Sequence, residues 1–306
     1  MPELPEVQTI ASDLNEVVGG RLIEAVAVSL PKIVAGDLDR FTRLVTGAEI
    51  REVVRMGKWV RFNLEAAEGP AVMLAHLKMT GQFHLGPWPG GCDKKADAWE
   101  VHDHAAFRLN GQPTDSDTLY YRDIRQFGRL RAFDLMELDE FLTQLDQGPD
   151  PLTVAPDEFF QRVTARKGRL KCVLLDQTTV AGLGNIYVDE GLFAAGLSPV
   201  RSAATLSRTE TNLLLKELKR ILSASIKARG STTSNYQGLK GGGSFQNVHK
   251  VYGRAGEPCV KCGTPIERSV VAGRSTHHCP HCQPAPEGPC SVKAARGVQA
   301  ARPKQS

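Results

Sequence analysis

Apolar side chains recur at helical spacing close to the start of the chain. They lie three or four residues apart, so they would share one face of a helix: Val7, Ile10, Leu14 and Val17. Pro5 suits a first helical turn, and the glycines at 19 and 20 would end the helix. The pattern predicts an amphipathic helix over Glu6–Val18.

From Arg21 to about Phe133 the pattern changes to short β-rich runs separated by Gly, Pro and Asp. The predicted strands are Ile23–Leu30, Ile50–Val54, Trp59–Leu64, Ala71–Leu77, Ala106–Leu109 and Gly128–Phe133. This half is expected to form a β-sandwich or barrel preceded by one helix.

A Pro- and Gly-containing stretch at 147–151 is predicted to link this half to a helical one. The predicted helices are Pro156–Arg166, Leu170–Asp176, Ile186–Ala195 and Ser207–Ala228. Gly182–Asn185 reads as a tight turn entering the third of these helices. The Gly-rich stretch Gly230–Asn247 is expected to be mobile or closely approached by a ligand.

The charge is unevenly distributed along the 306 residues, although the net charge is only +4. From Arg201 onward there are 17 Lys and Arg against 5 Asp and Glu, whereas the preceding residues hold 21 against 29. Clustered basic residues favour a polyanionic partner, or simply form a solvated surface and a basic tail. No apolar run is long enough for a membrane span and the N-terminus lacks signal-peptide character, so we expect a soluble intracellular protein with no membrane partner. We also expect it to be monomeric and cytoplasmic.

Four of the seven cysteines form two close pairs with the spacing of a metal site. Cys259 and Cys262 are separated by two residues, as are Cys279 and Cys282, and the run between the pairs suits a β-hairpin. Four thiolates leave no open coordination position, so the expected ion is one structural Zn²⁺. Nearby histidines could replace a cysteine, but they are more simply exposed hairpin residues: His277, His278 and His281. The other cysteines are expected to be free thiols: Cys92, Cys172 and Cys290.

Five motifs in order resemble the bacterial formamidopyrimidine-DNA glycosylase family. They are MPELPEV at 1–7, HLKMTG at 76–81, DIRQFG at 123–128, GLGNIY at 182–187 and the four-cysteine element, so that roughly residues 1–282 are covered. The resemblance implies an α+β chain that removes oxidised purines, such as 8-oxoguanine and formamidopyrimidines, from double-stranded DNA and then cleaves the strand at the abasic site by β,δ-elimination. The implied organisation is a catalytic β-sandwich (1–133), a linker (134–151), a helix–two-turns–helix domain (152–250), a zinc finger (251–282) and a disordered tail (283–306).

Pro2 becomes the chain terminus when Met1 is removed, and by resemblance it is the nucleophile. An α-amine has a pKa of about 7.7–8, so more of it is neutral at pH 7 than of a lysine. The neutral amine can attack the sugar C1′ and form an iminium, which makes elimination accessible. Glu3 can protonate the opening sugar oxygen. Glu6 either supports this site or is a favourable acid in the first helical turn.

Several residues are assigned roles by resemblance alone. Lys58 would contact phosphates beside the lesion and assist catalysis. Met79, Arg125 and Phe127 would fill the void left by the flipped nucleotide, although Gln126 and Ile124 depart from the family's usual basic residue and proline.

Phosphate contacts are assigned in the same way to residues of the C-terminal half. Asn185 would bind a phosphate, or cap a helix, or do both. Arg274 of the zinc finger would grip phosphates, although it and Arg268 could also simply face solvent. Lys171 and Tyr236 are weaker assignments, and the Gly-rich stretch corresponds to a loop that can cover the flipped purine.

Two alternatives remain open from the sequence. One is an endonuclease VIII-like enzyme acting on oxidised pyrimidines, but Leu4 together with Arg125 and Phe127 favours the purine branch. The other is a non-catalytic zinc-finger protein that binds nucleic acid, against which the presence of Pro2, Glu3 and Lys58 argues.

Overall fold

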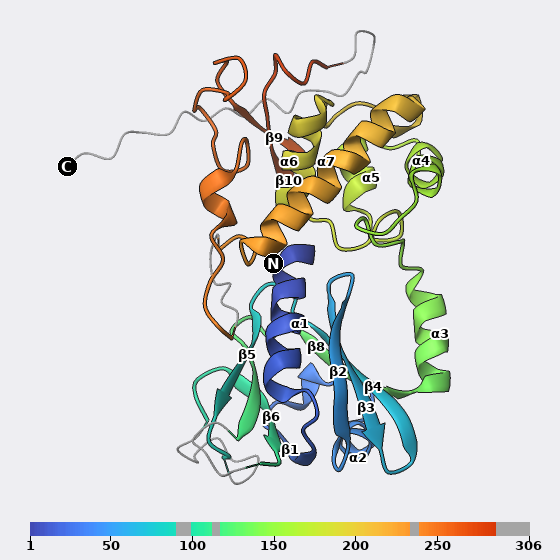
Figure 1. Ribbon diagram of the computed structural model, residues 1–306, viewed down its shortest axis with the longest axis vertical. Helices are drawn as coiled ribbons and strands as arrows, with labels where there is room; N and C mark the ends of the chain where they lie inside the picture. The colour runs from blue at the N-terminus through green and yellow to red at the C-terminus, as the bar shows by residue number, and fades with distance from the viewer. Residues whose placement is uncertain (90–98, 112–116, 233–238, 286–306) are drawn as a thin grey trace, which may run out of the picture.

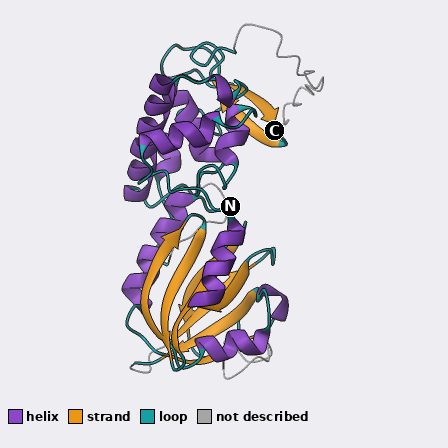
Figure 2. Ribbon diagram, turned by 90° about the vertical axis from the view of Figure 1, so that its right-hand side faces the viewer, coloured by secondary structure: helices purple, strands orange, loops and turns teal. Residues whose placement is uncertain are grey.

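The computed structural model describes residues 1–89, 99–111, 117–232 and 239–285, and these form two halves that meet at the N-terminus of the chain (Figure 1). Strands gather in one half and helices in the other (Figure 2). Cys92, Cys290, Tyr236 and most of the predicted tail lie outside the described residues. No helix in the described ranges is long and apolar enough to cross a bilayer.

The N-terminal half is a sandwich of two four-stranded antiparallel sheets. One sheet has the order β1-β6-β7-β5, with strands Ile23–Val28, Asp103–Leu109, Thr118–Asp123 and Gly81–Gly86. The other has the order β2-β3-β4-β8, with strands Glu49–Met56, Trp59–Ala66, Gly69–His76 and Arg129–Asp134. Alternating side chains, such as Val60, Phe62 and Leu64 of β3, enter the shared core and confirm the predicted sandwich.

Helix α1, Leu4–Val18, begins two residues before the predicted start and buries its apolar face against this core. Its side also bonds to the sandwich, because Asn15 Oδ1 accepts a hydrogen bond of 2.7 Å from Val53 N. At its first turn the environment changes: Leu4 packs in the core of the helical half, and its amide donates to Gly182 O at 3.0 Å. The helix therefore joins both halves.

Among the described α-helices and strands, four were absent from the sequence prediction: α2 (Leu38–Val45), β5, β7 and α3 (Leu135–Leu145). The expectation of a linker over 134–151 is wrong for most of that segment. Helix α3 has a capping box between Asp134 and Glu137, and its Leu138 and Phe141 pack against the outer face of the β2-β3-β4-β8 sheet. The chain passes from the sandwich half to the helical half over a short segment near residues 146–150.

The helical half contains α4 (Pro156–Thr164), α5 (Leu170–Leu175), α6 (Asn185–Ala195) and α7 (Arg208–Lys227), as predicted within two residues at each end. Helix α6 is buried almost all round, which suits its central place between α5 and α7. The hairpin of β9 (Glu267–Val271) and β10 (Arg274–His278) packs beside α6. Short 3-10 turns complete the chain: η1 (Pro31–Ile33), η2 (Ala203–Thr205) and η3 (Phe245–Val248).

Polar contacts cross between the halves on either side of α1. Arg55 of β2 bonds to Asp150, at the end of the segment that joins the halves, and its Nε donates to Gln8 of α1 at 3.0 Å. Arg229, after α7, forms a bidentate ion pair with Asp13 of α1 at 2.6 and 3.1 Å. These contacts hold the two halves in one orientation around the chain terminus.

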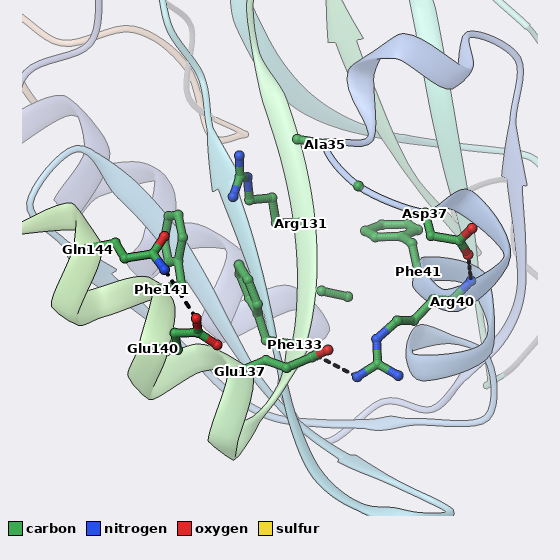
Figure 3. A pocket seen from close by; sticks show the side chains of 12 residues that line it. Ala35, Asp37, Arg40, Phe41, Arg131, Phe133, Glu137, Glu140, Phe141 and Gln144 are labelled. Atoms are coloured by element: carbon green, nitrogen blue, oxygen red, sulfur yellow. Dashed lines mark hydrogen bonds and ion pairs between the residues drawn. The ribbon is translucent and has the colours of Figure 1, made fainter.

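The hollow drawn in Figure 3 lies between α2, α3 and β8, on the outer part of the sandwich. Arg40 reaches across it to Glu137, and Phe41, Phe133 and Phe141 form its apolar parts. None of the residues singled out in the sequence lines it, so it is not a candidate for their chemistry.

Candidate active site and zinc centre

The N-terminal residues lie buried where the two halves meet. Pro2 is buried, and the Glu3 carboxylate accepts backbone hydrogen bonds from Ile186 N (3.0 Å) and Tyr187 N (3.3 Å). These amides form the first turn of α6, so Glu3 caps a helix that begins 182 residues further along the chain. Of the roles left open for Asn185, the helix cap is not the one seen, because Gly184 occupies the N-cap position and the carboxylate that binds the first-turn amides comes from the other half.

Two glycines explain how Glu3 and Leu4 approach this turn. A Cβ at Gly184 would lie 2.3 Å from Glu3 Cδ, and Gly182 has a φ of +84° with its Cβ position 2.9 Å from Leu4. Only glycine fits such close approaches and the left-handed conformation. The N-terminal residues Glu3 and Leu4 thus pack directly against the predicted tight turn at Gly182–Asn185.

Glu6 is buried and supports the terminus directly. Its Oε2 accepts a hydrogen bond from Glu3 N at 2.9 Å, and its Oε1 accepts from Tyr187 Oη (2.5 Å) and Ser231 N (2.7 Å). Glu6 therefore fills both roles left open from the sequence: it is an acid in the first turn of α1, where its bond to Glu3 N completes a capping box, and it joins the N-terminus to Tyr187 and Ser231. Tyr187 and Ser231 were not singled out, since nothing local in the sequence indicates that they would meet Glu6.

Lys58 occupies the two-residue turn between β2 and β3, after Gly57 with a φ of +58°. The side chain is only 8% exposed and faces the charges of Glu3 and Arg274. Burial lowers the pKa of Lys58, and Glu3 opposes that shift. The turn therefore brings a confined amine to the same place as the buried N-terminus.

The electrostatics of this place favour proton transfer near neutral pH. Burial raises the pKa of Glu3 to about 7, although the charge of Lys58 opposes this. Burial also lowers the pKa of the Met1 amino group, while the Glu3 carboxylate raises it. An amine uncovered at Pro2 would lie one residue deeper, where the same desolvation favours its neutral form.

Met79, Arg125 and Phe127 lie together on two loops at the ends of the sandwich strands, and their side chains are exposed. Met79 is 41% and Phe127 51% exposed, whereas an apolar core residue would be covered. The Arg125 guanidinium lies 4.8 Å from the centre of the Phe127 ring. The structure therefore presents these three side chains outward as a group.

A buried carboxylate sets the shape of both loops. Asp123 accepts hydrogen bonds from Thr80 Oγ1 and from Gly128 N (2.7 Å), and Thr80 Oγ1 accepts from Arg125 N at 3.0 Å. Asp123 thus links the loop of Met79 with the loop of Phe127. Asp123, the first residue of the DIRQFG motif, therefore has a structural role.

Asn185 and Lys171 both bond to the zinc-finger hairpin. Asn185 Nδ2 donates to Ser275 O at 2.9 Å, while Asn185 Oδ1 is buried without a partner in the described structure. Lys171 Nζ donates to Ser275 O at 2.8 Å and to Asp189 Oδ1 at 2.7 Å, and Asp189 Oδ2 accepts from His277 N. Helices α5 and α6 are joined to β10 by these contacts.

The DNA contact expected of Lys171 does not agree with its position. Both side chains of the Lys171–Asp189 pair are fully buried, and the ammonium is already bonded. A buried ion pair is favourable only with such complete hydrogen bonding, so the lysine is not available to a phosphate in this conformation. Its place is that of a residue that positions the hairpin.

The four predicted thiols gather at the base of the hairpin. Cys259, Cys262, Cys279 and Cys282 have sulfur atoms that all lie within 4.8 Å of one another, with pairs at 3.5 and 3.9 Å. Tetrahedral Zn–S bonds of about 2.3 Å require sulfur atoms about 3.8 Å apart, so the cluster fits one Zn²⁺. The ion would be structural, as expected.

The hairpin histidines only partly match the expectation that they are exposed. His281 is exposed, but His277 is buried and its amide is bonded to Asp189. None of the three belongs to the thiol cluster. Arg268 and Arg274 are exposed, and Arg274, which starts β10, lies close enough to Lys58 for its charge to lower the pKa of that lysine.

Family models match three successive segments of the chain. They describe a formamidopyrimidine-DNA glycosylase N-terminal domain (1–130), the corresponding H2TH domain (147–237) and a zinc finger found in FPG and IleRS (256–285). Similar curated proteins include the formamidopyrimidine-DNA glycosylase of Geobacillus kaustophilus, 40% identical over 92% of this chain and the whole relative, and that of Carboxydothermus hydrogenoformans, 42% identical with the same coverage. The chain belongs to the formamidopyrimidine-DNA glycosylase family.

Solved structures of this family have the same fold. The MutM (Fpg) protein of Thermus thermophilus is 41% identical with a TM-score of 0.78, over 92% of this chain and 98% of that one. MutM in complex with DNA containing carbocyclic 8-oxo-G has a TM-score of 0.82 at 32% identity, over 93% of this chain and all of that one. The two-domain fold, the zinc-finger element and the family membership expected from the motifs are confirmed.

The raised pKa of Glu3 leads to a prediction about pH. If its protonated form serves as the acid, single-turnover base excision should fall as the pH rises through about 7, because the carboxyl then loses its proton. Glu3→Gln should slow excision by about 100-fold or more and remove this alkaline limb. Glu24→Gln, at an exposed glutamate of β1, is the control and should keep the full profile.

The thiol cluster predicts a dependence of DNA binding on metal. Cys279→Ser should lower the bound zinc below one ion per chain, measured by atomic emission, and weaken duplex binding by about tenfold or more because the hairpin loses its anchor. Cys172→Ser, at a half-buried thiol of α5 outside the cluster, should retain both. Full zinc content in Cys279→Ser would contradict the four-thiolate site.

The buried ion pair predicts a large loss of stability. Lys171→Met leaves the Asp189 carboxylate buried without its counter-ion, and should lower the free energy of unfolding by about 3–5 kcal/mol in urea titrations. Lys167→Met, at an exposed lysine just before α5, should change it by less than about 0.5 kcal/mol. Equal stability of the two variants would show that Lys171 is not part of the folded interior.

Proposed function

We propose that this DNA glycosylase excises oxidised purines from duplex DNA and cleaves the resulting abasic site through a Schiff base on Pro2. The observation that carries the proposal is the burial of Pro2 beside a Glu3 carboxyl with a pKa of about 7 at the N-terminus of α6. An amine nucleophile and a proton donor of matched pKa are what the reaction requires.

In the proposed chemistry, the neutral Pro2 amine forms a bond to C1′ as the bond from C1′ to the base breaks. The base leaves with the electron pair, and the ammonium formed at Pro2 loses its one N–H proton, which balances the proton that the departing base takes up. Glu3 then protonates the ring oxygen as the C1′–O4′ bond breaks and the nitrogen lone pair forms the C1′=N bond, which leaves a cationic iminium because this nitrogen has no proton left to lose. The iminium acidifies the C2′ proton, and removal of that proton expels the 3′-phosphate; a δ-elimination then releases the 5′-phosphate.

Lys58 and Arg274 are assigned to the phosphates that flank the damaged nucleotide. Both are cationic and face the same buried site, one from the sandwich and one from the zinc finger. Phosphate contacts of this kind orient a duplex without reading its sequence. Asn185 remains a candidate for a further contact, because it begins α6 and the N-terminus of a helix favours a phosphate.

Met79, Arg125 and Phe127 are assigned to the space that the flipped nucleotide leaves. Their exposure and rigid support suit insertion into a base stack, for which apolar side chains compensate the lost stacking. The similar solved structures include the Lactococcus lactis Fpg with DNA that contains Fapy-dG, as a point mutant, and with DNA that contains an abasic site, which supports the same lesions as substrates here. Because the relatives are bacterial and the substrate is chromosomal, we infer that the enzyme acts in the cytoplasm.

Trapping with borohydride tests the proposal. Protein whose Met1 has been removed should form a covalent adduct with duplexes that contain 8-oxoguanine, and mass spectrometry should locate the adduct on Pro2, because reduction fixes the iminium. Protein that keeps Met1 or carries an N-terminal tag is the matched control, and it should bind the duplex without trapping or cleaving it.

Substrate comparison distinguishes the other readings. Faster trapping on thymine glycol than on 8-oxoguanine would indicate the oxidised-pyrimidine specificity. Correctly processed protein that binds both duplexes but traps neither would contradict catalysis and favour a binding protein.

A further inference from the structure

A histidine of the C-terminal half lies behind the candidate active site. His249, directly after η3, is 7% exposed and packs between the rings of Phe245 and Tyr252, with centroid distances of 5.7 and 5.8 Å. Its Nε2 lies 3.0 Å from Ser231 Oγ, a hydrogen bond that is itself buried. Neither the sequence motifs nor the proposed chemistry uses this residue.

Ser231 connects His249 to the buried carboxylate that holds the N-terminus. Its amide donates to Glu6 Oε1 at 2.7 Å, and its hydroxyl lies 3.3 Å from Tyr187 Oη, which donates to the same Glu6 oxygen at 2.5 Å. Glu6 Oε2 accepts from Glu3 N. A continuous chain of buried polar contacts therefore runs from His249 to the Pro2–Glu3 peptide.

The backbone around Ser231 has little freedom. Gly230 has a φ of +82°, and a Cβ there would lie 2.7 Å from Glu6 Oε1. On the other side, Thr232 N donates to Gln246 Oε1 at 2.8 Å and Gly243 N donates to Thr232 Oγ1 at 2.8 Å. Ser231 is thus held where the Gly-rich segment begins, and among the described residues its hydroxyl contacts His249 and Tyr187.

Burial favours the neutral form of the His249 ring, against the charge of a nearby carboxylate. Burial lowers the pKa of His249, while the Glu190 carboxylate of α6 raises it. Glu190 is already bonded to the amides of Lys250, Val251 and Tyr252, and Arg254 approaches the His249 carbonyl at 3.5 Å. Ser231 itself contacts Glu6 of α1 and Tyr187 of α6, and Tyr187 in turn contacts Ser225 of α7.

Protonation of the ring would change the direction of the shared hydrogen bond. A neutral His249 can accept the Ser231 proton or donate its own at Nε2, whereas the cation can only donate. Ser231 would then have to turn its proton toward Tyr187 Oη, which also lies 2.6 Å from Ser225 Oγ. Competition at that hydroxyl would disturb the short bond from Tyr187 to Glu6.

We infer that His249 is a positioning residue for the excision reaction. Acting through Ser231 and Tyr187, it holds Glu6, and through Glu6 the peptide that carries the nucleophile, without touching DNA. The inference rests on the proposed role of Pro2. It predicts that the ring has to be neutral for full activity, so that His249 adds its own decline on the acid side of the pH profile.

Three variants test this inference. His249→Leu removes the hydrogen bond, His249→Gln offers a replacement polar group without titration, and Val248→Gln changes a half-exposed neighbour as the control. The measurements are the single-turnover excision rate on an 8-oxoguanine duplex from pH 5 to 8 (roughly the range in which a histidine titrates), the Kd for a duplex with an uncleavable abasic analogue, and Tm.

At neutral pH, His249→Leu should excise about fivefold or more slowly with a Kd within about twofold of the parent protein, as expected for one lost buried hydrogen bond that orients the site. His249→Gln should recover most of the rate. The ratio of the parent rate to the His249→Gln rate should fall as the pH falls, because the parent alone acquires a charge at this position; titration of Pro2 and Glu3 cancels in the ratio.

The inference is overturned if His249→Leu excises at the parent rate, if His249→Gln loses as much activity as His249→Leu, or if the rate ratio is independent of pH. A parent protein that traps DNA through Pro2 while showing any of these results would contradict only the role of His249. A parent protein that does not trap DNA would contradict the proposed function itself.

Discussion

The Glu3 carboxylate at the start of α6 is the contact on which the arrangement of this protein depends. A buried carboxylate is costly unless amides or cations surround it, and here Ile186, Tyr187 and the nearby Lys58 supply them from both halves. The same burial that ties the halves together brings the pKa of Glu3 to about 7. Stability of the domain interface and readiness for proton transfer therefore have one physical origin.

Helix α6 carries this coupling further into the C-terminal half. Its first turn binds Glu3, its Tyr187 binds Glu6, and its Asp189 forms the fully buried pair with Lys171 beneath the zinc-finger hairpin. The thiol cluster keeps the hairpin folded, and the hairpin places Arg274 near Lys58. A structural metal can thus affect the site although it has no place for a substrate.

The two exposed loops of the sandwich follow a different physical rule. Their backbone is partly strained, with positive φ at Lys78 and Gln126, and it is held by the buried Asp123 and Thr80. This support lets Met79 and Phe127 remain exposed without collapsing onto the core. Side chains held in this way lose less conformational entropy when they bind a partner.

Local pattern determined much of this protein: the period of α1 and of the later helices, the alternation in the sandwich strands, the thiol spacing, and the motifs that identify the family. Helix α3 was missed because Pro and Gly just beyond it suggested a linker. The short strands β5 and β7 were missed because motif residues flank them. Only the tertiary structure decided that Glu3 caps α6, that Lys171 is buried, and that Tyr187, Ser231 and His249 meet behind Glu6. These contacts join residues far apart in sequence, and a polar side chain looks the same locally whether water or a distant buried partner satisfies it.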